Sequence, residues 1–557
     1  MLQVGTHYDD EPYLLSLLQR EEIMGIAPES EHCADIVVIN AKVWTGNPAQ
    51  PYAESFAIRN GIFIAVGSNR DIQSLIGKIT HVIDAMRMFI TPGFTDSHLH
   101  LIEGGFRLNS VQLRDASTPD LFVSRIADYA KSAKSGKWIT GGDWDHNLWG
   151  GNLPQKDWID LVTPRHPVWV SRLDGHMALA NSLALDLAGI DQTTPEVPGG
   201  TIVRNDDGSP QGVIKDNAMA LVERFIPQPP ANANEEAVRV ASQYLVSNGV
   251  TSVHHMGTWD EMEILESLHR KNGLQLRISS AVPLPAWHKL SDKVKKEGPG
   301  DSWLRIASLK SFVDGSLGSH TAAFFEPYSD MPHDSGLFLN RLEDLEKWIT
   351  IADKLKLQVI IHAIGDRAIS ELLTVYQHVI AKNGRRDRRL RIEHLQHVNQ
   401  DILGKCRDLE IIASMQPYHL ADDGCWAENV LGIARIPDMH AYRSIIRQKV
   451  KLIFGSDWYV SPPKPLLGIH AAVTRRTLDG KYPNGWTPEQ KISAEEALKA
   501  YTVTPAYATF EETIKGTIEV GKLADFVVLT QDLLSISTDE INQVHVHSTY
   551  INGKQVF

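Results

Sequence analysis

The sequence predicts an α/β protein, a (β/α)8 barrel of the TIM type that carries a small β-sandwich domain and one long insert. Eight short apolar segments alternate with helical patterns between residues 92 and 504, as repeated βα units require. Segments rich in β-forming residues stand at both ends of the chain. A long insert, about residues 105–248, separates the first barrel strand from the second.

The two chain ends have the same character and are expected to fold together. Each contains short alternating segments around an Asn-Gly pair, Asn60-Gly61 near the start and Asn552-Gly553 near the end. An Asn-Gly pair between alternating apolar residues is a strong hairpin signal. We therefore predict one composite β-sandwich domain formed by residues 34–91 and 505–557.

The barrel strands are the eight apolar segments between these ends. In chain order they read "FTDSHLH", "GVTSVHHMG", "LQLRISSAVP", "LRIASLKSFVDG", "LQVIIHAIGD", "LRIEHLQHV", "IIASMQP" and "KLIFGSDW". Eight parallel strands are the number that closes such a barrel. The barrel is assigned to residues 92–504, including the insert, which is expected to cover or shape the substrate pocket.

Two smaller features complete the outline. Within the insert, the segment "GGTIVRNDDGSPQGVIK" predicts a hairpin whose turn uses Asp207-Gly208. Residues 1–33 are interpreted as an N-terminal extension with one amphipathic helix, roughly residues 11–24, to which the sequence assigns no function.

Composition and charge narrow the functional classes. A formal net charge of −13 disfavours nucleic acid or an anionic membrane as a partner. The three cysteines lack paired spacing, which argues against a disulfide framework or a thiolate zinc site. The sequence contains no apolar stretch of about 18 residues, and its first residues lack the pattern of a signal peptide. These features predict a cytoplasmic enzyme with a small-molecule substrate and leave a homo-oligomer open.

Metal-binding residue types gather at the predicted strand ends. In "FTDSHLHL", His98 and His100 are two apart on a strand and project from one face, with Asp96 in line behind them. Barrel enzymes keep their chemistry at strand C-termini, and the later strands carry four further polar residues there: Lys310, His362, His394 and Asp457. Imidazoles and a carboxylate are the ligand set expected for zinc or a similar divalent cation.

Each of these residues also has a purely structural interpretation. A single buried histidine is more often a hydrogen-bonded core residue than a ligand. Lys310 alone would be a strand-edge lysine, and Asp457 a turn or helix N-cap residue. Six suitable residues in the right order at five strand ends are hard to obtain by chance. The joint pattern therefore predicts a metal site.

Seven segments carry a resemblance to a known family: "TPGFTDSHLHL", "KSFVDGSLGSHTAA", "VIIHAIGDRA", "RIEHLQHV", "SMQPYHLADD", "GSDWYVSPPKPLLGI" and "GTIEVGKLADFVVL". They resemble the amidohydrolase superfamily of metal-dependent hydrolases. The similarity is greatest to the family 3 branch, with its N-substituted-formamide deformylase-like and exoenzyme-regulatory-protein-like members. It extends over nearly the whole chain from about Asp35 onward. The resemblance implies the fold and the ligand set but does not specify a substrate.

The resemblance implies a centre of two divalent cations, with Zn2+ first and Mn2+ or Fe2+ as other candidates. His98 and His100 would bind the more buried cation, and His362 and His394 the more exposed one. Lys310, carboxylated on its amine, would bridge the two. Asp457 would bind the buried cation and act as general base and then general acid, passing a proton from the metal-activated bridging water to the leaving nitrogen. The implied reaction is hydrolysis of a non-peptide C–N bond in an amide, formamide or cyclic amide.

The same branch suggests residues that face the substrate. The segment "SRLDGHMALAN" places Asp174 and His176 in the insert, although an aspartate capping the following helix explains the former equally well. His419 and Asp423 follow the seventh strand and would polarise a substrate carbonyl or orient the leaving group. Five aromatic residues near the pocket loops would add an apolar surface, with core packing as the ordinary alternative: Trp144, Trp149, Tyr418, Trp426 and Trp458.

Two other functions stay open. One is deamination of a heterocycle at a single metal. Purine-type deaminases have a Glu three residues after the fifth-strand histidine, and this chain has Gly365 there, followed by Asp366, which weakens the purine-type alternative. The other is a catalytically silent regulatory protein on the same fold, which the intact ligand set disfavours. Two, one or no equivalents of bound metal would separate the three functions.

Overall fold

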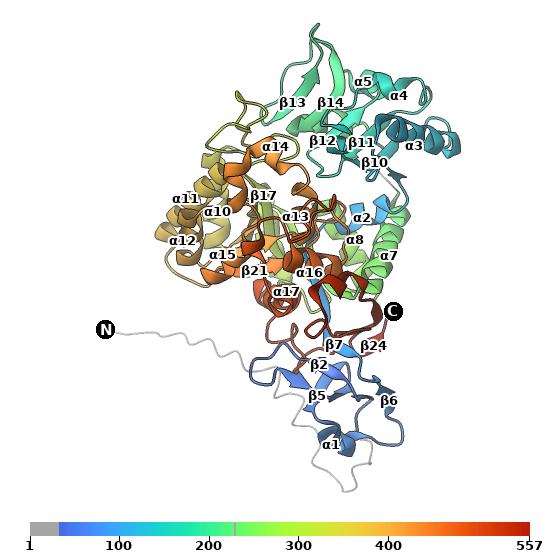
Figure 1. Cartoon of the computed structure of the whole chain (residues 1–557), viewed down its shortest axis with the longest axis vertical. Helices are drawn as coiled ribbons and strands as arrows, with labels where there is room; N and C mark the ends of the chain where they lie inside the picture. Colours follow the sequence, from blue (N-terminus) through green and yellow to red (C-terminus); the bar gives the residue numbers. More distant parts are fainter. Residues whose placement is uncertain (1–32, 228–229) are drawn as a thin grey trace.

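The computed structural model describes residues 33–227 and 230–557, so the helix expected at residues 11–24 lies outside the described part. Figure 1 shows three regions along the long axis of the molecule. The insert lies at one end, the barrel in the middle and the β-domain at the other end.

The central region is a barrel of eight parallel strands, and every predicted barrel strand is present. Their sheet order follows the chain from the first to the last. They are β8 (Phe94–Leu99), β15 (Val250–Met256), β16 (Arg277–Pro283), β17 (Leu304–Phe312), β18 (Gln358–Ala363), β19 (Arg391–His394), β20 (Ile412–Met415) and β21 (Lys451–Phe454). The predicted TIM-type fold is therefore confirmed.

The first and last strands are joined just beyond β21 and close the barrel. The Asp457 amide donates to the His98 carbonyl at 2.6 Å, and the His100 amide donates to the Trp458 carbonyl at 2.7 Å. The Ser456 hydroxyl donates to Asp96 at 2.6 Å from the same segment. The residues that close the barrel thus stand next to the predicted metal ligands.

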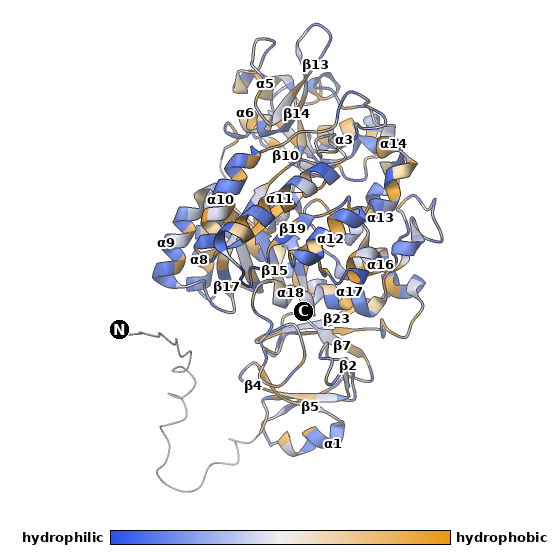
Figure 2. Ribbon diagram, turned by 90° about the vertical axis from the view of Figure 1, so that its left-hand side faces the viewer, coloured by the Kyte–Doolittle hydropathy of each residue, from blue (hydrophilic) through white to orange (hydrophobic). Residues whose placement is uncertain are grey.

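Helices surround the barrel on its outside (Figures 1 and 2). Their apolar faces follow a helical period and pack on the strands, as at α8, which begins with a capping box between Thr258 and Glu261. The helices are α7 (Ala231–Ser247), α8 (Trp259–Arg270), α9 (Trp287–Glu297), α10 (Leu342–Lys354), α11 (Asp366–Asn383), α12 (Gln400–Asp408), α15 (Tyr442–Arg447), α16 (Pro465–Thr474), α17 (Ala494–Tyr501) and α18 (Val503–Ala508).

Both chain ends contribute to one β-sandwich below the barrel. One sheet contains β5 (Ile62–Gly67), β4 (Ser55–Arg59), β1 (Ile36–Ile39) and β6 (His81–Asp84). The other contains β24 (Lys554–Gln555), β23 (Val546–Ile551), β22 (Phe526–Leu529), β7 (Phe89–Pro92), β2 (Lys42–Trp44) and β3 (Tyr52–Ala53). Asn60-Gly61 and Asn552-Gly553 form the two predicted hairpin turns with positive φ angles. A strand from the C-terminal end, β22, therefore lies between β23 and the N-terminal strand β7.

Aromatic packing joins the two ends in the sandwich core. The Phe56 and Phe526 rings are 5.0 Å apart edge to face, and Phe526 stacks on Tyr550 at 4.3 Å. Beside this core, Arg277 of the barrel donates to the buried Asp525 carboxylate at 2.9 Å. The domain is thus anchored to the barrel as well as to itself.

Deleting the residues after Val520 is expected to make the protein insoluble. The deletion removes β22 and β23, leaves β7 with an unpaired edge and uncovers Phe56, and an exposed apolar strand edge promotes aggregation. The soluble fraction after expression measures the effect. Removing only Val556 and Phe557, which are exposed, serves as the control. A soluble and fully active deletion would contradict the composite domain.

The insert between α2 (Leu101–Arg107) and α7 has its own sheet and lies over the C-terminal end of the barrel. The predicted hairpin is present, with Gly208 at φ +84°. The strands are β9 (Val111–Gln112), β10 (Ile139–Trp144), β11 (Val168–Arg172), β12 (Met177–Ala180), β13 (Gly200–Arg204) and β14 (Pro210–Asp216), and α3 (Pro119–Ser132), α4 (Asp157–Asp160) and α5 (Ser182–Ala188) cover them. No helix in the described ranges is long and apolar enough to span a membrane.

Candidate metal centre

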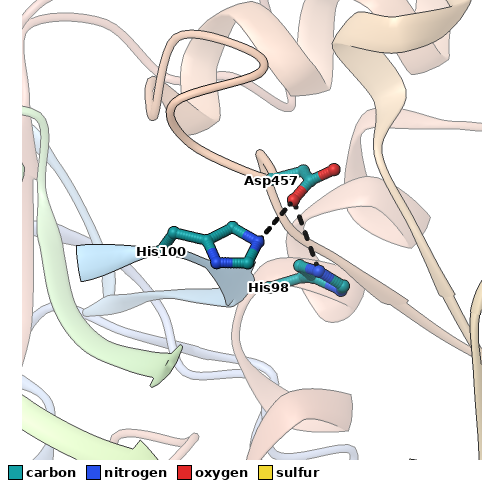
Figure 3. Close-up of side chains that lie close together, drawn as sticks. All are labelled: His98, His100 and Asp457. Atoms are coloured by element: carbon teal, nitrogen blue, oxygen red, sulfur yellow. Dashed lines mark ion pairs between the residues drawn. The ribbon is translucent and has the colours of Figure 1, made fainter. Parts of the chain in front are cut away.

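His98, His100 and Asp457 meet where the barrel closes (Figure 3). The Nε2 atoms of the two histidines lie 3.3 and 3.4 Å from one Asp457 oxygen. Asp457 adopts φ +57°, an uncommon angle for a residue other than glycine. Burial opposes its ionisation, but His98 and the neighbouring imidazoles outweigh burial and hold the pKa of Asp457 well below its usual range. The carboxylate is therefore charged and aimed at the two imidazoles.

A second group of imidazoles lies beside the first, with the His98 and His394 rings 5.0 Å apart. The His362 and His394 rings are 4.4 Å apart, and the His419 ring stacks parallel to His394 at 6.3 Å. His394, His419 and Asp457 present ligand atoms within 4.8 Å of one another, as do His98, His100 and Asp457. The structure therefore brings His419, which was predicted to face the substrate, into a candidate ligand group.

Lys310 projects from β17 and is buried. Its Nζ lies 3.8 Å from the centre of the Phe312 ring, and no carboxylate within the described ranges forms an ion pair with it. Burial lowers the pKa of Lys310 to about 8. A buried amine with this pKa has a larger neutral fraction near pH 7 than an exposed lysine.

The residues fit a divalent cation because two ring nitrogens lack any other partner. His394 Nδ1 and His419 Nε2 are buried and have no hydrogen-bond partner among residues 33–227 and 230–557. Burial lowers the pKa values of His362 and His394 well below the ordinary histidine value, and neutral imidazole is the form that binds metal. The His362 Nε2 donates to the Gly315 carbonyl at 2.9 Å, which leaves Nδ1 for a ligand.

The Asp174 side chain is used to fasten the insert to the barrel. It pairs with Arg172 at 2.8 Å and accepts hydrogen bonds from Ser319 at 2.9 Å and from Ser316. Both serines lie in the loop after β17. Asp174 therefore makes structural contacts while it also lines the cavity, and it does not cap a following helix.

His176 reaches the site from the same insert turn. Its Nδ1 donates to Asp216 at 2.6 Å, and its ring lies 5.3 Å from the His362 ring. Asp216 ends β14 at φ +48°, and its side chain is fully buried. His176 and Asp216 together line a cavity of about 390 Å3 that also contains His98, Lys310 and Asp457.

Of the other predicted pocket residues, Asp423 and Trp426 line the site, whereas Trp144 and Trp458 do not. Asp423 lines the narrower neighbouring part of the site, where it accepts from His440 Nε2 at 3.1 Å, and burial raises its pKa to about 7. Trp144 is fully buried in the insert core and donates to the Val170 carbonyl, and Trp458 packs against Tyr244 and Gly104. Neither tryptophan is among the residues that line the two parts of the site.

Comparison with known proteins identifies the family. A model described as "Amidohydrolase family" matches residues 81–557. The chain belongs to this family. It is 38% identical to Protein LONG AFTER FAR-RED 3 of Arabidopsis thaliana, over 98% of this chain and 95% of that protein. It is also 27% identical to N-substituted formamide deformylase of Arthrobacter pascens, over 93% of this chain and 97% of that protein.

Solved structures agree with the family. An uncharacterized metal-dependent hydrolase from Pyrococcus horikoshii superposes with a TM-score of 0.72 at 26% identity, covering 90% of this chain and 99% of that one. The fold, the family and the histidine–aspartate groups together support a metal-dependent hydrolase, and its candidate ligands for a divalent cation lie at the barrel mouth.

Three acidic residues of this site escaped sequence reasoning. Glu393 accepts from His98 Nδ1, Asp216 accepts from His176, and Asp314 accepts from the backbone amides of three residues at the barrel mouth. The signal for Glu393 was present, since Arg391 and Glu393 are two charged residues on one face of a buried strand. Nothing local distinguishes Asp216, because its role depends on where a hairpin ends relative to the barrel.

Proposed function

We propose that the chain hydrolyses a C–N bond of a small molecule, in an amide, formamide or cyclic amide, at a centre of two divalent cations. Asp457 carries the proposal, because this one carboxylate belongs to two separate groups of candidate ligands. Hydrolases such as aminopeptidases use centres of two cations. Zn2+ is the first candidate for a site rich in imidazole, with Mn2+ or Fe2+ as others.

The proposed ligands are the residues at the barrel strand ends. His98 and His100 would hold one cation together with Asp457, and His362 and His394 the other. His419 stacks on His394 and would either complete the second group or contact the substrate. When bound, a divalent cation lowers the pKa of a coordinated water and polarises a carbonyl group.

Lys310 is proposed to carry a carboxylate on its amine. The neutral amine would attack carbon dioxide, forming an N–C bond and releasing one proton, to give an anionic carbamate. The buried position of Lys310 beside Asp457 and His98 supports this modification, since an ammonium ion there would repel a cation. The carbamate oxygens would then bridge the two groups of histidines.

Proton transfer is assigned to Asp457. Its carboxylate is ionised and faces the cavity, so it can accept a proton from water and return that proton to the leaving nitrogen. His176, held by Asp216, and Asp423 are proposed to contact the substrate from the insert and from α13 (Pro417–Asp423). The cavity volume of about 390 Å3 suits a small molecule.

Two alternatives predict different metal contents. A deaminase acting on a heterocycle would use one cation, and a catalytically silent regulatory protein would need none. The formamide deformylase among the relatives gives a reason to place formamides among the first substrates. Hydrolysis is favoured over a silent regulatory protein because all six predicted metal ligands are present in the chain.

A metal and substrate screen tests the proposal. Purified protein is expected to bind two equivalents of zinc or manganese and to hydrolyse at least one member of a panel of N-acyl amines, formamides, cyclic amides and carbamates. Elemental analysis gives the metal content, and release of amine gives the rate. One equivalent with ammonia release from heterocycles would support the deaminase, and no metal with no turnover would support the regulatory protein.

A further inference from the structure

A buried carboxylate lies directly beneath the candidate ligand His98. The Oε2 atom of Glu393 is 2.5 Å from His98 Nδ1, and both side chains are almost fully excluded from solvent. The opposite ring nitrogen, His98 Nε2, faces Asp457. A carboxylate that accepts from Nδ1 fixes the proton on that atom and leaves a lone pair on Nε2.

Glu393 is itself held by Arg391, two residues earlier on β19. The guanidinium donates to both Glu393 oxygens, Nε to Oε1 at 2.8 Å and Nη2 to Oε2 at 3.1 Å. Residues two apart on a strand face the same side, so both side chains point into the barrel. The carboxylate therefore has a fixed position and no freedom to turn away from His98.

The same guanidinium joins four barrel strands. It donates to the Ser97 carbonyl on β8 at 2.8 Å, to His254 Nδ1 on β15 at 2.9 Å and to the Ser414 hydroxyl on β20 at 3.2 Å. A buried ion pair is expensive unless its remaining hydrogen-bonding atoms are satisfied. A network this complete beneath one imidazole indicates a role beyond filling the barrel interior.

We infer that Arg391 and Glu393 are positioning residues for the metal centre, which fix the orientation and tautomer of His98 so that its Nε2 faces the cation. The inference rests on the proposed metal site and deepens it. Neither residue touches substrate. Both act through His98, so their loss should lower the affinity for metal more than it lowers the activity of metal-saturated protein.

Glu393→Gln tests the inference by removing the charge while keeping the size. The dissociation constant for zinc is expected to rise about 10- to 100-fold, the usual effect of losing such a partner, measured by competition with a chromogenic chelator. Glu511→Gln is the matched control. Glu511 is also a buried carboxylate paired with a cation, Lys515 at 2.8 Å, and it belongs to neither candidate ligand group.

The outcomes separate positioning from structure. Weaker zinc binding in Glu393→Gln than in Glu511→Gln, at similar loss of thermal stability, supports the inference. Unchanged affinity with lowered stability overturns it. If Glu393→Gln does not fold, Arg391→Lys is the second variant, because it keeps the charge but loses the two-pronged geometry of the guanidinium. A smaller loss of zinc affinity is then expected. Unchanged zinc affinity would again overturn the inference. Wild-type protein that binds no metal would overturn both proposals, and the wild-type titration alone reveals that case.

Discussion

Lys310→Ala is expected to lose at least one metal equivalent and nearly all hydrolytic activity. The change removes the side chain proposed to bridge the two cations and leaves a vacancy among Asp457, His98 and Phe312. A small carboxylate such as formate or propionate is expected to enter that vacancy and restore part of the activity. Metal analysis and rates with and without added carboxylate measure both effects.

Lys515→Ala is the matched control for this prediction. Lys515 is as buried as Lys310, but it pairs with Glu511 and donates to Ser252, away from the candidate ligands. Its loss should lower stability and leave metal content intact. If Lys310→Ala behaves in the same way and added carboxylates do nothing, Lys310 is an ordinary structural lysine.

A density map of metal-loaded crystals grown with bicarbonate gives an independent check on Lys310. A carbamate adds one carbon and two oxygens beyond Nζ, and a ligand oxygen should lie about 2 Å from zinc. An unmodified Lys310 well beyond that distance from any metal would leave a mononuclear site as the better description.

The barrel was predictable because its strands are buried on both faces. Such strands form short continuous apolar segments, and the polar residues that interrupt them, such as His98 and Lys310, then mark strand ends. The hairpin turns were equally clear, because Asn60-Gly61 and Asn552-Gly553 need positive φ angles. These signals are local, so they can be recognised in the sequence without knowledge of the tertiary fold.

Apart from its hairpin, the fold of the insert was not predictable, and neither were the pocket walls, because both depend on contacts between distant segments. Asp174 lines the cavity, but the Ser316 and Ser319 hydroxyls of another loop also donate to its carboxylate, which pairs with Arg172. Trp144 follows two glycines and an aspartate, a sequence typical of a loop. In the structure, however, Trp144 is part of the hydrophobic core of the insert. No periodicity in the chain distinguishes these outcomes.

Asp457→Asn is expected to keep most of the bound metal and to lower turnover by at least about 100-fold, the contribution typical of a general acid–base group. An asparagine oxygen can still face His98 and His100, but the amide cannot accept and return a proton. The measurement is the rate per equivalent of bound metal, which separates lost chemistry from lost occupancy. Both numbers are needed, since Asp457 is also a proposed ligand.

Asp525→Asn gives the control for that comparison. Asp525 is a buried carboxylate that pairs with Arg277 at the junction of barrel and β-domain, remote from the cavity. Its amide variant should lose stability while the rate per bound metal stays near the wild-type value. Near-normal turnover of fully loaded Asp457→Asn would remove Asp457 from proton transfer. His176 with Asp216, or Asp423, would then be candidates for that role, because these acid–base groups also line the two parts of the site.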